Sequence, residues 1–355
     1  MNSRSILLTG LLIGLTDCGH SASTKNSDKP GVAPSPAADA AGAKPADPAG
    51  GANSAVNPHV TPTPPQTATT TPPTSSNPSL AVNADTSWGG SVALTGDATI
   101  ASGATLTIVA GSKVAAGSGF KIIVRGKLVI DGTPDRVSLG AAAAGSQWGG
   151  ISIAQGGSAV LTGVDISDAT YGVDCGSGAV VCTVQNSTVK TGQTGLSLAG
   201  PATVEKTTVE DNSSGAILVL PGATVTISDS IVRTTQGDLI TQRGGSMSVQ
   251  HSTVGGPNYQ HCAFHIEGGD VVVVSANDIT SSVYGMMIGG IAAASINGNN
   301  FTNNQSGQDI LKIGTVSSID LTGNYWDHGA PNLGAGFDTS KPSPLVVAST
   351  GPRSP

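Results

Sequence analysis

The sequence contains few aromatic and few charged residues for its length. Of its 355 residues, 3% are Phe, Trp or Tyr and 11% are Asp, Glu, Lys or Arg, whereas glycine occurs 49 times. This composition is atypical of an α/β enzyme and suits a fold built from tight turns and stacked aliphatic side chains. The scarcity of aromatic rings also disfavours a cleft that grips neutral sugars by stacking.

Positive charge is scarce as well. The chain has 16 Lys and Arg against 23 Asp and Glu, which gives a formal net charge of −7. This balance argues against nucleic acid and against an anionic membrane surface as partners, although a local basic patch could still meet a polyanion. The four cysteines are too few for a disulfide scaffold.

The dominant feature of the sequence is a repeat from Leu161 to Trp326. Apolar pairs five positions apart recur every 20 to 25 residues, as Leu161/Ile166, Val184/Val189, Val204/Val209, Ile227/Val232, Val249/Val254, Val274/Ile279, Ile296/Phe301 and Leu321/Trp326. A period of this length is typical of a solenoid, in which each unit buries its apolar face against its neighbours. The units are short and rich in Val, Ile and Thr, which predicts strands and excludes helix pairs.

Three segments carry a family resemblance. Ile296–Phe301 reads Ile-Asn-Gly-Asn-Asn-Phe, Leu321–Trp326 reads Leu-Thr-Gly-Asn-Tyr-Trp, and Gly126–Arg136 reads Gly-Lys-Leu-Val-Ile-Asp-Gly-Thr-Pro-Asp-Arg. They resemble the secreted right-handed parallel β-helix family, which includes pectate-lyase-like solenoids. The resemblance covers about residues 88 to 345 and implies a single right-handed parallel β-helix of roughly ten coils. It implies little about activity, because this fold carries lyases, hydrolases and adhesins alike.

The N-terminal part of the chain predicts export. Arg4 precedes an apolar run, Ile6 to Leu15, that is too short to span a bilayer, which indicates a signal peptide over residues 1–18. Its end, Leu15-Thr-Asp-Cys18, resembles a bacterial lipoprotein box, although Asp17 departs from the usual pattern. The resemblance implies lipidation of Cys18 and an outer-membrane or cell-surface lipoprotein of a Gram-negative bacterium. Ordinary signal cleavage would instead give a secreted or periplasmic protein.

Composition divides the remainder of the chain into three parts. Residues 19–85 consist mostly of Ala, Pro, Thr and Ser, which predicts a disordered tether that cannot bury enough apolar surface to fold. The β-helix is expected over residues 86–330. The tail, residues 331–355, is expected to cap the C-terminal edge, where unpaired strands would invite association.

Functional residues of a β-helix are expected in columns, because equivalent positions of successive coils stack about 4.8 Å apart. The repeat predicts one charged cluster of Lys190, Glu210 and Arg233, with Asp211 beside it. Polysaccharide lyases of this fold use a Lys or Arg as the base and carboxylates, sometimes through calcium, to neutralise a uronic acid, and the resemblance would carry these roles to the cluster. The alternative is a solvated ladder of alternating charges. The sequence favours this alternative, since consecutive coils lack the runs of Asp that a lyase would show.

A second group of candidates surrounds the longest inter-coil loop, residues 255–261. His251, His261, His265 and Glu267 are candidate binding residues, because loops on one side of a solenoid are common binding sites. Metal or general-acid chemistry is the alternative to ordinary loop and core roles for these residues. No metal or other cofactor is expected, and calcium enters only with the lyase alternative.

Two smaller sets complete the candidates. Asp165, Asp168 and Asp174 lie close in sequence, as the carboxylates of a glycoside hydrolase would, but capping of turns explains them equally well. Cys175 and Cys182 bracket a short loop, which predicts a disulfide in an exported protein, with two buried free thiols as the alternative.

The leading hypothesis is therefore a non-enzymatic envelope protein. Its lipid anchor would hold it at a membrane, and its rigid β-helix would present a surface to a polysaccharide or a cell-surface protein. The alternative is a lyase or hydrolase that acts on an acidic polysaccharide. The sequence does not determine the oligomeric state.

Overall fold

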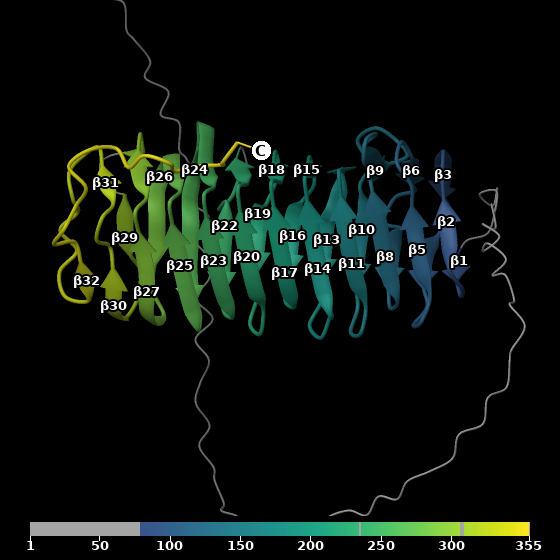
Figure 1. Ribbon diagram of the computed structural model, residues 1–355, viewed down its shortest axis with the longest axis horizontal. Helices are drawn as coiled ribbons and strands as arrows, with labels where there is room; N and C mark the ends of the chain where they lie inside the picture. The colour runs from purple at the N-terminus through teal and green to yellow at the C-terminus, as the bar shows by residue number, and fades with distance from the viewer. Residues whose placement is uncertain (1–78, 234–235, 306–308, 355) are drawn as a thin grey trace, which may run out of the picture. The chain divides into compact units, whose positions relative to one another are not determined.

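The computed structural model describes residues 79–233, 236–305 and 309–354, with the backbone alone for Ser79 and residues 257–260. The regular elements β1 to β32 of these ranges are all strands, and they wind through coils stacked along one axis (Figure 1). No helix in the described part of the chain is long and apolar enough to cross a membrane. The predicted right-handed parallel β-helix of roughly ten coils is confirmed.

The coils have three faces, and each face is a ladder of parallel strands. The first face pairs in the order β1 (Ser79–Val82), β4 (Asp97–Ile100), β7 (Lys121–Val124), β10 (Trp148–Ile153), β13 (Ala169–Cys175), β16 (Thr194–Leu198), β19 (Gly215–Val219), β22 (Ile240–Arg243), β24 (Thr253–Gly268), β26 (Asp278–Ile288) and β29 (Ile310–Lys312).

The second face pairs in the order β3 (Ser91–Leu94), β6 (Lys113–Ala116), β9 (Val137–Ala141), β12 (Val164–Ser167), β15 (Thr188–Lys190), β18 (Thr208–Glu210), β21 (Ile231–Arg233), then the long strands β24 and β26 again, β28 (Asn300–Thr302) and β31 (Tyr325–Trp326). Strands β24 and β26 therefore continue around the corner between the second and the first face.

The third face pairs in the order β2 (Thr86–Trp88), β5 (Thr105–Ile108), β8 (Lys127–Asp131), β11 (Ser158–Thr162), β14 (Val181–Gln185), β17 (Pro201–Glu205), β20 (Thr224–Ser228), β23 (Ser246–Gln250), β25 (Val271–Ser275), β27 (Ile291–Asn297), β30 (Val316–Asp320) and β32 (Phe337–Asp338).

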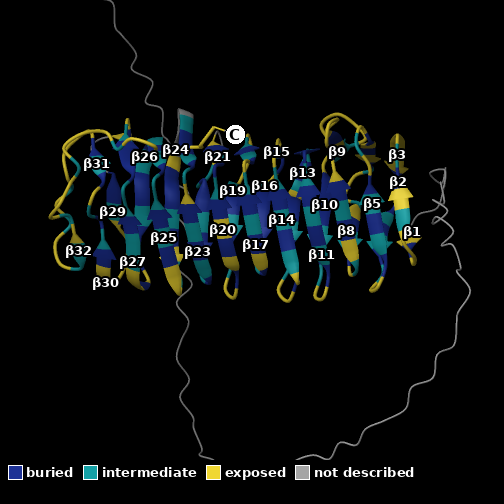
Figure 2. Ribbon diagram, viewed as in Figure 1, coloured by how far each residue is buried: buried dark blue, intermediate teal, exposed yellow. Residues whose placement is uncertain are grey.

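The apolar repeat of the sequence forms the core at one corner of every coil. The first member of each pair lies on the third face, where Val204 pairs in register with Ile227. The second member lies on the second face, where Val209 pairs with Val232, and all four side chains are buried. Figure 2 shows the buried residues along the strands and the exposed ones mainly at the turns. The five-residue spacing is thus the distance around one turn.

A second, polar ladder fills the inside of that same turn. It consists of one buried residue per coil, namely Ser187, Thr207, Ser230, Ser252, Asn277, Asn299 and Asn324. Each side-chain oxygen accepts the backbone N–H of the equivalent residue one coil earlier; the Ser252 N–H, for example, donates to Asn277 Oδ1 at 2.9 Å. The ladder satisfies buried donors that the strands leave unpaired, so it ties adjacent coils together from within.

The strands extend beyond the predicted N-terminal boundary of the β-helix. Strand β1 lies within the range assigned to the tether and pairs with β4, because Val82 is apolar and its side chain reaches the core. Residues 1–78, including Cys18 and the signal and tether predicted there, lie outside the described residues. At the other end β32 pairs with β30, after which the chain runs back along the turns.

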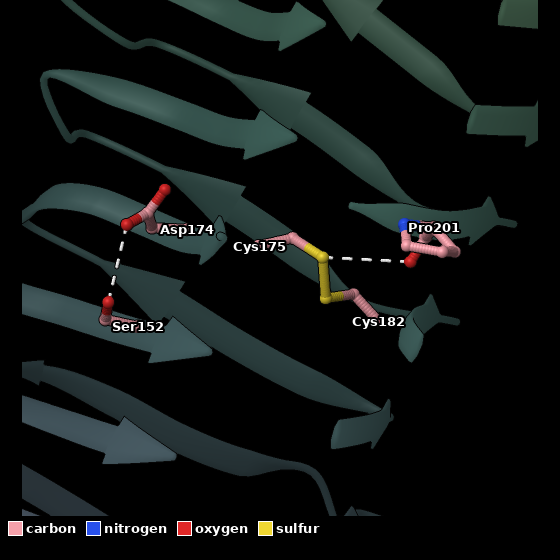
Figure 3. Close-up of a disulfide and its surroundings, with 5 residues drawn as sticks. All are labelled: Ser152, Asp174, Cys175, Cys182 and Pro201. Atoms are coloured by element: carbon pink, nitrogen blue, oxygen red, sulfur yellow. Dashed lines mark hydrogen bonds between the residues drawn. A yellow bond between two sulfur atoms is a disulfide. The ribbon is translucent and has the colours of Figure 1, made fainter. Parts of the chain in front are cut away.

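Two of the cysteines are joined near the middle of the solenoid. Cys175, the last residue of β13, forms a disulfide with Cys182 of β14, with an S–S distance of 1.97 Å (Figure 3). Pro201, one coil further on, places its carbonyl oxygen 3.7 Å from Cys175 Sγ. The disulfide therefore closes the turn between β13 and β14, within a single coil, beside the buried core.

Candidate metal centre

One corner of the solenoid, between the second and the first face, brings two coils together around a polar cluster. Pairing of β21 with β24 ends at Val232–Val254, and pairing of β22 with β24 begins at Ile240–Phe264. Opposite this gap the register between β24 and β26 shifts between Gly255 and Gln260. The polar cluster described next joins the two coils at this corner, with Asp238 in one coil and His261, Cys262 and His265 in the following one.

The cluster is centred on the Asp238 carboxylate, which accepts three hydrogen bonds from the following coil. Asp238 Oδ1 accepts from the Cys262 thiol at 2.8 Å and from His261 Nδ1 at 2.9 Å. Asp238 Oδ2 accepts from His265 Nδ1 at 2.6 Å. We call these four residues the Asp238 cluster. Cys262 is fully buried and the side chain of His261 is 51% exposed, so the cluster extends from the core to solvent.

These contacts shift the pKa values of three groups. Burial opposes ionisation of Asp238, but the hydrogen bonds from His265, Cys262 and His261 outweigh it and lower its pKa to about 2. The bond to Asp238 raises the pKa of His265, against the opposing effect of burial. Burial, reinforced by the Asp238 charge, raises the pKa of the Cys262 thiol far above its ordinary value. The metal-free cluster therefore holds an ionised carboxylate next to a protonated thiol.

A second layer of side chains surrounds the two histidines. His265 Nε2 lies 3.5 Å from Glu267 Oε1, and Arg243 Nε lies 3.3 Å from Glu267 Oε2. The His261 ring meets the edge of the Tyr284 ring with centroids 5.7 Å apart. His265 thus has a carboxylate at each ring nitrogen; in a metal site one nitrogen ligates the ion and the other donates to a carboxylate, which is the place that Glu267 takes beside Nε2.

The cluster has the donor spacing of a metal site. Asp238, Cys262 and His265 each offer one ligand atom, and these atoms lie within 4.8 Å of one another. His261 Nδ1 adds a fourth donor 3.5 Å from the Cys262 sulfur. One other such group occurs among the described residues, at the C-terminal end of the solenoid, and it consists of Asp309, Asp327 and His328.

The structure brings together three of the four predicted binding residues. His261, His265 and Glu267 meet around Asp238, whereas His251 lies in the turn before β24, where its Nδ1 is 3.3 Å from Ser349 O. Sequence reasoning missed Asp238. Its separation of 23 residues from His261 equals one coil, so the period of the repeat was the signal that could have found it.

The predicted charged column is also present. Lys190, Glu210 and Arg233 stand in register on successive strands of the second face, and Arg233 Nη2 lies 2.9 Å from Glu210 Oε2. Asp211 follows in a turn with φ of 56°. The ion pair satisfies two of these charges, and polysaccharide binding or cleavage at this column stays a prediction.

The three neighbouring aspartates have separate partners. Asp165 Oδ1 accepts from Arg136 Nη2 at 2.7 Å, Asp168 accepts from its neighbour Ser167, and Asp174 accepts from Ser152. These contacts are those of residues that stabilise turns and strands, and a hydrolase role for them likewise stays a prediction.

Comparison with known proteins adds one finding. Residues 130–332, more than half of the 355, match the model of a protein family described as periplasmic copper-binding protein (NosD). The matched range includes the whole Asp238 cluster. No curated protein and no solved structure matches the chain. The expectation of no cofactor is wrong, because the matching family is described by the binding of copper.

Proposed function

We propose that this chain, which belongs to the periplasmic copper-binding protein (NosD) family, binds copper through the Asp238 cluster. The observation that carries the proposal is the convergence of a thiol, an imidazole and a carboxylate within 4.8 Å, from two coils of the solenoid. Asp238 comes from one coil and Cys262 and His265 from the next, so the stacking of the coils assembles this set.

The donor chemistry of the cluster fits copper. Thiolate sulfur selects Cu(I), and imidazole nitrogen binds both common oxidation states of copper. His261 and His265 supply two imidazoles beside the buried sulfur of Cys262, whereas the second group, Asp309, Asp327 and His328, offers no sulfur. The Asp238 cluster is therefore the better match to the description of the family.

The surrounding residues would prepare the ligands. Glu267 faces one nitrogen of His265 and so fixes the orientation of the ring, and Arg243 holds Glu267 in place. Cys262 must lose its proton to become a ligand, so copper binding through the thiolate would release a proton to solvent. Copper in this setting would supply a Lewis acid and a one-electron couple.

Titration of the metal-free full chain tests the proposal. Competition with a chromophoric Cu(I) chelator under anaerobic conditions should give one copper per chain. Cys262→Ala and His265→Ala should each weaken the affinity by about 100-fold or more, since loss of second-shell partners alone costs about 10- to 100-fold.

The chain offers matched controls for this titration. His328 belongs to the other candidate group, and Arg136 pairs with Asp165 in coils that carry no member of the cluster. His328→Ala and Arg136→Ala should bind copper as the parent chain does. Binding that survives loss of both Cys262 and His265 would refute the assignment, and loss of binding in His328→Ala alone would move the site to the C-terminal end.

The family description supports an exported, periplasmic chain, and the lipid anchor is a separate part of the proposal. Acylation of Cys18 would hold the β-helix at a membrane through residues 19–78. Metabolic labelling with an alkyne fatty acid should mark the parent chain and leave Cys18→Ser unmarked. Equal labelling of both would exclude acylation at this cysteine.

A further inference from the structure

The C-terminal segment Ser343–Arg353, here called the strap, lies across the turns of the solenoid. In Figure 1 it runs in yellow from β31 back along one edge to a point near β18. The Ser343 N–H donates to Asn324 O at 2.8 Å, and the Val347 N–H donates to Asn300 Oδ1 at the same distance. The strap thus bonds to the outside of the turns that the polar ladder ties from inside.

The strap continues over the next turns with close contacts. Thr350 Oγ1 donates to Asp278 Oδ1 at 2.6 Å, and the Gly351 N–H donates to Ala276 O at 3.1 Å. Gly351 has φ of 72°, and a Cβ there would lie 2.6 Å from Asp278 Oδ2, so a side chain at this position would be strained and would displace the Asp278 carboxylate.

Arg353 anchors the end of the strap on Asp229. The Asp229 side chain is 3% exposed and accepts the Arg353 backbone N–H, Nε at 2.8 Å and Nη2 at 2.6 Å. Just before Thr350, Ser349 O lies 3.3 Å from His251 Nδ1. One short segment therefore contacts three successive turns, at Asp229, His251 and Asp278.

The chain continues from each of those turns to the Asp238 cluster or to its neighbour Tyr284. Asp229 precedes β21 and lies nine residues before Asp238, and His251 precedes β24 and lies ten residues before His261. Asp278 begins β26, which carries Tyr284 against the His261 ring. Strand pairing between the two ligand-bearing coils stops after Val232–Val254 and resumes at Ile240–Phe264, so the ties on either side of this gap help to set the spacing of the coils at the cluster.

We propose that the strap is a positioning element of the copper site, with Arg353 as its positioning residue. The ligands come from two adjacent coils, so the distance between the ligand atoms depends on the distance between those coils. The strap holds both coils and the next one at the turns. This inference rests on the proposed copper binding by the Asp238 cluster.

The experiment compares Arg353→Ala with Arg136→Ala in the full chain. Arg136 makes an analogous ion pair with Asp165, also at a turn leading into the second face, but in coils that carry no member of the cluster. Arg353→Ala should weaken Cu(I) affinity by roughly 2- to 30-fold, the range of couplings carried through a packed network, and Arg353→Lys should recover part of it. Arg136→Ala should leave the affinity unchanged.

A second readout needs no copper. The Leu239 N–H donates to Cys262 O at 3.0 Å and joins the two ligand-bearing coils beside the cluster. Its hydrogen exchange in the metal-free chain should quicken by about 10-fold in Arg353→Ala and stay unchanged in Arg136→Ala.

The two proposals fail in different ways. A parent chain that binds no copper would overturn the copper site, whereas copper affinity and Leu239 exchange that are unchanged in Arg353→Ala would overturn the strap. Equal effects of Arg136→Ala and Arg353→Ala on both readouts would show general stabilisation and also overturn it.

Discussion

Cys262 Sγ lies 2.8 Å from Asp238 Oδ1, although the two residues are 24 positions apart and belong to different coils. The contact joins a thiol that no disulfide uses to a carboxylate that already accepts two imidazoles. All three partners of Asp238 are donors, so the cluster depends on a residue that can only accept.

Asp238→Asn should therefore destabilise the metal-free chain. The amide has nearly the shape of the carboxylate, but its NH₂ group would face donors of Cys262 or the histidines and leave a buried group unsatisfied. The expected loss is about 1–3 kcal/mol of unfolding free energy, measured by urea denaturation. Asp211→Asn is the control, because no described group donates a hydrogen bond to the Asp211 carboxylate; an equal loss in both variants would contradict this account.

The Asp229–Arg353 pair predicts a specific loss of stability in acid. The hydrogen bond from Arg353, opposed by burial, lowers the pKa of Asp229 from its ordinary 3.8 to about 2. A carboxyl whose pKa is depressed by folding stabilises the folded chain above pH 3.8, and this contribution is lost as the pH falls through about 2. Thermal unfolding of the parent and Asp229→Asn should differ most above pH 3.8 and converge near pH 2. A difference that stays constant over this window would refute the assignment.

The polar ladder predicts that two substitutions of Asn299 lower the stability of the chain by different amounts. Its Oδ1 accepts the Asn277 N–H at 3.0 Å, and its Nδ2 donates to Val274 O at 2.8 Å. Asn299→Ala leaves both groups unsatisfied inside the turn, which should cost about 2–5 kcal/mol. Asn299→Ser should cost less, since Ser252 fills the equivalent place in an earlier coil. Chemical denaturation of the two variants measures the order, and a serine variant as unstable as the alanine variant would contradict it.

Gly255, where the β24–β26 register shifts, should not tolerate a side chain. Its φ is 137°, and a Cβ would lie 1.7 Å from Thr280 O, which is backbone and cannot move aside alone. Gly255→Ala should destabilise the chain by about 3 kcal/mol or more. Gly119→Ala is the matched control, because Gly119 also has a positive φ of 76° but nothing within 4 Å of the added carbon, so the expected cost is about 1 kcal/mol. Thermal denaturation compares the two, and equal costs would show that backbone conformation alone sets the penalty.

Sequence reasoning predicted the parts of this chain that repeat. Val209 and Val232 recur because every coil must bury an apolar residue at the same place, and a period is visible without a structure. The charged column followed from the same register. These features depend on the neighbouring coil alone, which is why one sequence suffices to find them.

The Asp238 cluster depends on the coil that departs from the repeat. The register between β24 and β26 shifts between Gly255 and Gln260, so the usual column positions do not place His265 beside Asp238. Proximity in the sequence also grouped His251 with His261, although His251 lies in the turn before β24 and outside the cluster. The Arg353–Asp229 pair spans 124 residues and follows no period, so nothing in the sequence predicts it.

The three ladders have a further consequence for how such chains can vary. If a coil were inserted or removed between β5 and β17, the coils on either side would still pair in the same way. The residues of the Asp238 cluster would keep their positions relative to one another. The number of residues between Asp238 and His265 cannot vary in this way, because the two coils that carry these residues form a single site. Family members are therefore expected to differ in the number of coils that precede this interval while its own length stays constant.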